Sequence, residues 1–60
     1  MAEYRAYSVG YDGHFVGYEG FVACDDDEAI RNAKRLLCDH DIELWNGERF
    51  VMRLNRNDAP

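Results

Sequence analysis

The chain has 60 residues, 47% of them hydrophobic, and twelve acidic against seven basic side chains give a formal net charge of -5. A chain of this length forms one domain at most, and so small a domain has little room for a deep substrate cleft. Four Tyr, three Phe and one Trp favour a folded chain over a disordered acidic segment. We expect a single domain over residues 1–60, ordered from about residue 3 to residue 54.

Two β-rich runs, residues 4–9 and 15–23, flank the turn sequence Tyr11-Asp12-Gly13 and predict a hairpin. A type I turn with Gly13 left-handed pairs Gly10 with His14. One face then carries Arg5, Tyr7, Val9, Phe15, Gly17, Glu19, Phe21 and Ala23, with Arg5 opposite Glu19, and the other carries Tyr4, Ala6, Ser8, Val16, Tyr18, Gly20 and Val22. A two-residue Asp12-Gly13 turn instead groups Tyr7, Val9, Val16 and Tyr18. Both registers stay open, because a slip of one residue swaps the faces.

The middle of the chain predicts an amphipathic helix. Asp25 followed three residues later by Glu28 indicates a capping box at its start. The apolar side chains then follow helical spacing, at Ala29, Ile30, Ala33, Leu36 and Leu37. We expect the helix to stop near Asp39 and to leave Cys38 on its solvated flank.

A second hairpin follows, with strands over residues 42–45 and 49–54. Asn46-Gly47 joins them, a dipeptide favoured in primed hairpin turns because both residues accept positive φ. The tail, residues 55–60, is expected to fray. The predicted fold is therefore α+β, in ββαββ order, with a four-stranded antiparallel sheet and one helix packed on one face.

The two cysteines bear on stability and on location. A single core in a chain this short needs help from a disulfide, a metal or a partner subunit. Cys24 and Cys38 lie at the two ends of the predicted helix, roughly 20 Å apart at a rise of 1.5 Å per residue, whereas a disulfide needs Cα atoms within about 7 Å. Unbridged cysteines and an N-terminal segment without an apolar core predict a cytoplasmic protein. The longest apolar run, Phe21 to Cys24, is too short to span a membrane.

One helix covers one sheet face, so the aromatic surplus of the first hairpin is expected on the other face. Such an exposed apolar patch is typical of an interaction surface. We expect a homodimer, formed through the sheet face or an edge strand, and a possible protein partner. The predicted interface residues are Tyr4, Tyr7, Val16, Tyr18, Val22 and Trp45.

The side chains that could carry out catalysis or bind a metal or a phosphate are each explained by a structural role. His14 beside Asp12 could be a general base. Catalysis also needs a pocket that excludes water, which so short a chain can hardly enclose alone, so we expect His14 to be a solvated turn residue. Asp39-His40-Asp41 lacks the paired spacing of a zinc site, and no phosphate-binding Gly-rich loop precedes the helix. We therefore expect no catalytic residue, no metal ligand, no cofactor and no enzymatic activity.

Arg49, Arg53 and Arg56 lie near Trp45 and Phe50 and could bind nucleic acid. The acidic chain, with a pI near 4.7, argues against a polyanionic partner. The function expected first is a small non-enzymatic module that self-associates and binds a protein through sheet-face aromatics. The alternative is a regulatory or antitoxin-like protein that binds a heterologous partner through its acidic helix start or through Arg49 and Arg53.

Three segments carry a resemblance: Asp12-Gly13-His14, residues 26–30 and residues 40–47, with Arg49 and Val51 beyond. They resemble a group of very short, uncharacterised α-proteobacterial proteins with a "DGHI" turn, a "DDEAAI" helix start and a "GHDVELWQGxRxV" end. This chain departs from them in Asp39, where the Gly before the His is expected, and in Phe15 for Ile. The first hairpin and the helix are also similar to HicB-type antitoxins, a resemblance that implies a dimerising sheet and helix.

Overall fold

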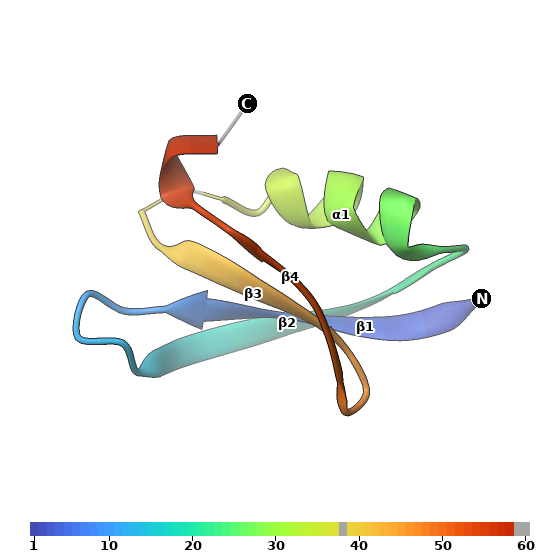
Figure 1. Ribbon diagram of the computed structural model, residues 1–60, viewed down its shortest axis with the longest axis horizontal. Coiled ribbons are helices and arrows are strands. Elements are labelled where there is room, and N and C mark those ends of the chain that lie inside the picture. The colour runs from blue at the N-terminus through green and yellow to red at the C-terminus, as the bar shows by residue number, and fades with distance from the viewer. Residues whose placement is uncertain (38, 59–60) are drawn as a thin grey trace.

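The computed structural model describes residues 1–37 and 39–58. Its elements are β1 (Ala2–Val9), β2 (Phe15–Ala23), α1 (Asp26–Lys34), β3 (Asp41–Asn46), β4 (Arg49–Leu54) and a 3₁₀ turn η1 (Arg56–Asp58). The strands form one antiparallel sheet in the order β2-β1-β3-β4, and α1 lies on one side of it (Figure 1). The predicted α+β fold in ββαββ order is confirmed. In the described part of the chain no helix is long and apolar enough to cross a membrane.

Both predicted registers of the first hairpin are present, one after the other. At the turn the Gly10 N–H donates to the His14 carbonyl at 2.7 Å and Gly13 has a φ of +88°, as the type I turn requires. A β-bulge then shifts the pairing, so that Tyr7 lies opposite Tyr18 and Arg5 opposite Gly20. The predicted pairing of Arg5 with Glu19 is therefore wrong, because the bulge inserts one residue and moves every later pair.

The hydrophobic core lies between α1 and the sheet side that α1 covers. Its buried members are Tyr4, Ala6, Ala23, Ala29, Ala33, Leu37, Ile42, Leu44 and Leu54. The expectation that Tyr4 belongs to an exposed interface is wrong, because its side chain is only 3% exposed. The bulge explains the error: it pairs Tyr4 with Phe21 on the covered side, and strand alternation then places Tyr18 on the other side.

The helix is shorter than its apolar periodicity predicts. It ends at Lys34 instead of near Asp39. After it, the amides of Arg35, Leu36 and Leu37 each bond to the carbonyl three residues earlier, at 3.0–3.2 Å. Such tighter turns finish a helix and bring Leu37 into the core. The predicted exposure of Cys38, and with it the distance between the two cysteines, lies outside the described residues.

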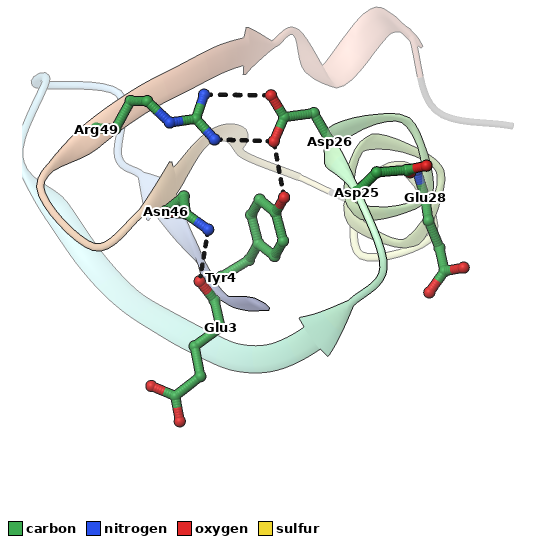
Figure 2. Close-up of polar contacts among 7 residues, drawn as sticks. All are labelled: Glu3, Tyr4, Asp25, Asp26, Glu28, Asn46 and Arg49. Atoms are coloured by element: carbon green, nitrogen blue, oxygen red, sulfur yellow. Dashed lines mark hydrogen bonds and ion pairs between the residues drawn. The ribbon is translucent and has the colours of Figure 1, made fainter. Parts of the chain in front are cut away.

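The second hairpin turns one residue later than predicted. Gly47 and Glu48 are its central residues, and of the residues described only Gly13 and Gly47 have positive φ. Asn46 is therefore a strand residue, and its side-chain amide donates to the Glu3 carbonyl at 3.2 Å (Figure 2). A single positive φ at the first central position is typical of a type II′ turn, which needs Gly at that position. Asn46 then lies before the turn and pairs with Arg49.

The chain after β4 forms the 3₁₀ turn η1. The Arg56 N–H donates to an Asp41 carboxylate oxygen at 2.8 Å. The Arg56 guanidinium lies over the Tyr11 ring, 5.1 Å from its centre. These contacts place η1 near the first hairpin turn. The predicted fraying of residues 55–60 stays a prediction.

The start of α1 is fixed from two sides. The Asp25 side chain accepts a hydrogen bond from the Glu28 N–H at 2.8 Å, as the predicted capping box requires, while Glu28 reaches back to the Cys24 N–H at 3.3 Å. Asp26 accepts a hydrogen bond from the Tyr4 hydroxyl at 2.7 Å and one from each terminal nitrogen of Arg49, at 2.9 and 3.2 Å (Figure 2). The helix start is thereby tied to β1 and β4.

This contact makes the stability of the fold depend on pH. The hydrogen bonds from Arg49 and then from Tyr4 lower the pKa of Asp26 below its ordinary 3.8. A lowered pKa means that the folded chain favours the ionised carboxyl, so its contribution is complete above pH 3.8 and is lost as the pH falls through the folded value. The hydrogen bond to Asp26 and burial raise the pKa of Tyr4 above 10.0, so the Tyr4 contribution is present below pH 10.0 and is lost at higher pH.

We therefore expect Asp26→Asn to flatten the acid side of the stability profile. Urea unfolding at a series of pH values would show a smaller loss of unfolding free energy below pH 3.8 in the variant than in the wild type. Asp12 and Asp41 also have lowered pKa values, so some acid sensitivity remains in the variant. Equal slopes in both proteins would contradict a role for the Asp26 carboxylate.

Candidate interaction surface

Aromatic side chains gather on the sheet side opposite α1. The pairing register places Tyr7 beside Tyr18 and Trp45 beside Phe50 on this side. We call the set the aromatic face; it consists of Tyr7, Phe15, Tyr18, Val22, Trp45 and Phe50. Four of its members are about half exposed: Tyr18 at 59%, Phe15 and Val22 at 52% and Phe50 at 49%. The helix α1 lies on the other side of the sheet (Figure 1).

The rings form two groups. Over β1 and β2, Tyr7 stacks on Phe15 with ring centres 4.9 Å apart and contacts Tyr18 at 5.5 Å. Over β3 and β4, Trp45 meets Phe50 edge to face at 5.4 Å. Neighbouring rings already fix each other in both groups, so a partner that binds them would lose little side-chain entropy.

Charged side chains lie among these rings and are largely paired. The Arg5 guanidinium lies over the Tyr18 ring, 5.1 Å from its centre. Arg53 binds Glu43 at 3.2 Å and Asp41 at 3.0 Å. The Arg56 N–H and then Arg53 hold the pKa of Asp41 below its ordinary value. The polar groups are thus already satisfied within the chain, and the exposed rings remain available for contact.

The structure brings together most of the predicted interface. Tyr7, Tyr18, Val22 and Trp45 lie on the aromatic face, and Val16 lies exposed at the bulge of β2. Sequence reasoning left out Phe15 and Phe50, which complete the two ring groups. In one of the two predicted registers Phe15 shares a face with Tyr7. That shared face is the sequence signal that could have added Phe15 to the predicted interface.

The two histidines lie near the first hairpin turn. His14 Nδ1 lies 3.0 Å from Asp12, and both side chains are exposed on the turn. The His14 backbone N–H and then its ring lower the pKa of Asp12. His40 lies beside Tyr11 at the wall of a hollow of about 350 Å³. The arginines lining that hollow are engaged with Asp41 and Tyr11. Over residues 1–37 and 39–58 no three metal-ligating side chains gather.

The charged side chains that the alternative function would use are already paired within the chain. Arg49 forms a two-bond ion pair with Asp26, the first residue of α1, and Arg53 is held by Asp41 and Glu43. An incoming partner would have to break these pairs before it could use either arginine. A partner that binds the exposed rings of the aromatic face does not have to break an ion pair first.

No protein-family model, no curated protein and no solved structure matches this chain. The resemblances that its short motifs indicate therefore stay predictions.

Proposed function

We propose that this chain is a small non-enzymatic module that self-associates and presents its aromatic face to a protein partner. The exposed rings on the uncovered side of the sheet carry this proposal. Exposed apolar side chains gathered on one side of a small domain are typical of an interaction surface. Aromatic residues are also the side chains most enriched at the centres of protein interfaces.

The composition of the core supports self-association. Four of its nine buried members, namely Ala6, Ala23, Ala29 and Ala33, are alanines, which bury little apolar area each. Meanwhile Phe15, Tyr18, Val22 and Phe50 stay about half exposed. A second copy in contact with the β1–β2 part of the aromatic face adds apolar burial that a chain of this size lacks. The Trp45–Phe50 part then remains for a partner.

Cellular location is part of the same proposal. Cys24 is exposed and carries a free thiol. Free thiols persist in a reducing compartment, which supports action in the cytoplasm.

Self-association is tested by measuring mass in solution. We expect light scattering to give a mass above 7.0 kDa that rises with concentration in the micromolar range. Tyr18→Arg is expected to return the mass to about 7.0 kDa, because it puts an added charge beside Arg5 in the middle of the contact.

Met52→Arg is the matched control. It adds the same charge at a partly exposed apolar residue, but Met52 pairs with the buried Leu44 and so belongs to the helix side of the sheet. The control should keep the wild-type mass. A wild type that stays at 7.0 kDa at all concentrations would contradict self-association.

A further inference from the structure

We infer that a second copy of this chain adds to the free edge of β2. The two β2 strands run antiparallel about a two-fold axis at Gly20, and the two four-stranded sheets become one. This inference rests on the proposed self-association and assigns its surface and register. It is carried by three features of β2: its unprotected edge, its outward backbone groups and its glycine.

The two edges of the sheet differ in protection. The sheet order makes β2 and β4 the edge strands. β4 has six residues, a bulge and two arginines, the usual devices that keep another strand away. β2 is nine residues long. It also has a bulge, at Val16 next to the hairpin turn, but residues 17–23 pair with β1 without a shift, contain no proline and carry Glu19 as their one charged side chain. An exposed strand of this kind is a template for pairing with another chain.

The pairing pattern identifies the free backbone groups. Asn46 and Arg49 flank a two-residue turn, so they form a hydrogen-bonded pair and the backbone groups of Asn46 point toward β4. Because these directions alternate along a strand, the backbone groups of Trp45 point toward its partner Arg5 on β1. The backbone groups of Arg5 point back toward Trp45, and therefore away from Gly20, its partner on β2. The N–H and C=O of Gly20 therefore face the free edge.

The same alternation turns the backbone groups of Tyr18 and Val22 to the free edge. With a two-fold axis at Gly20, all of these backbone groups form hydrogen bonds with the second copy. Gly20 pairs with Gly20 of the second copy, and on each side of the axis Tyr18 of one copy pairs with Val22 of the other. Tyr with Val is a favourable cross-strand pair. Glu19 meets Phe21 of the second copy and avoids its own equivalent. An axis at Tyr18 would instead bring Gly20 against the bulge residue Val16.

The glycine at the proposed axis is not required by the chain itself. Its φ is not positive, and a Cβ at this position would meet only the Tyr4 carbonyl oxygen, at an ordinary 3.9 Å. Glycine inside a strand weakens it and often marks a place where another backbone approaches closely. A second β2 strand at Gly20 is such an approach.

The arrangement also leaves the rest of the aromatic face open. Paired residues project to the same side of a sheet, so both helices lie on one side and both aromatic faces on the other. Trp45 and Phe50 lie on β3 and β4, away from the joined edge. They stay free for a protein partner.

The test removes one backbone donor. Chemical ligation between residues 1–23 and a segment that begins at Cys24 allows the Gly20 amide to be N-methylated. The methyl group blocks the outward N–H twice per dimer and leaves the bonds within the sheet intact. The dissociation constant of the dimer is expected to rise about a hundredfold or more.

N-methylation of the Arg53 amide is the matched control. The backbone groups of Glu43, two residues before Trp45, also point toward β1, so the N–H of its β4 partner Arg53 points outward from the other edge of the sheet. This variant should dimerise like the wild type. If the methyl group at Gly20 leaves the dimer intact while Tyr18→Arg disrupts it, self-association stands and the β2 edge is wrong. A wild type that is monomeric throughout would overturn both.

Cross-linking gives a second test that does not depend on backbone chemistry. With Cys24→Ser and Cys38→Ser in the background, Gly20→Cys places two thiols on residues directly opposite each other, within the Cα range of a disulfide. Oxidation should yield a covalent dimer. Glu48→Cys, in the β3–β4 turn, should stay monomeric under the same oxidation. Failure of Gly20→Cys to cross-link in a protein that still dimerises would overturn the proposed register.

Discussion

Leu44→Ala is expected to remove most of the stability of the fold. Leu44 is 0% exposed and is the largest fully buried side chain among the residues described. Replacing a buried Leu by Ala costs about 2–5 kcal/mol, and more where the surroundings cannot close the cavity. Here Ala6 pairs with Leu44, and other alanines share the core, so few neighbouring side chains can rotate into the gap. A chain of this size has only about 3–5 kcal/mol to lose.

Urea unfolding, followed by circular dichroism at one fixed protein concentration, measures this loss. The concentration must be the same for all variants because the proposed dimer would add to the apparent stability. Met52→Ala is the control, since Met52 lies directly opposite Leu44 but is 39% exposed. Its expected loss is below about 1 kcal/mol. A loss below about 1 kcal/mol for Leu44→Ala would contradict a core centred on this residue.

Phe50→Arg is expected to weaken binding of the proposed partner strongly while leaving the proposed self-association unchanged. Phe50 is 49% exposed and packs edge to face on Trp45, on the strand farthest from β2. Loss of a central aromatic contact costs about 2 kcal/mol or more, a decrease in affinity of at least about thirtyfold. A charge forced into an apolar contact without a counter-ion adds to this loss.

The measurement uses the single tryptophan of the chain. Proteins that co-purify with the wild type and with Met52→Arg, but not with Phe50→Arg, are purified and titrated against the wild-type chain. Trp45 lies in the proposed contact, so its emission should shift as the partner binds. A purified protein that binds wild type and Phe50→Arg equally would show that the Trp45–Phe50 part of the face is not the contact.

The elements that depend on local signals could be predicted. The Asp25 cap and the left-handed Gly13 each follow from residues within a few positions, and both are in the structure. The ββαββ order follows from the same kind of signal. The Gly47 turn was predicted with its positive φ, but its centre is shifted by one residue, because the type II′ turn needs Gly at the first central position.

The faces of the sheet could not be predicted in the same way. Tyr4 and Tyr18 share a face when the register is carried from the turn through the whole first hairpin. The bulge near Val16 changes that register, so Tyr4 goes under α1 and Tyr18 to the open side. The bulge near Val51 likewise sets Phe50 opposite Trp45.

The sequence by itself determined the kind and order of the elements and that one helix leaves half of the sheet uncovered. The tertiary structure decided which side chains occupy the uncovered half, and that Arg49 and the acidic helix start bind each other through Asp26. The physical reason is the two-residue period of a strand. One inserted residue reverses every side chain beyond it, and only packing against α1 and the neighbouring strands selects where that residue goes.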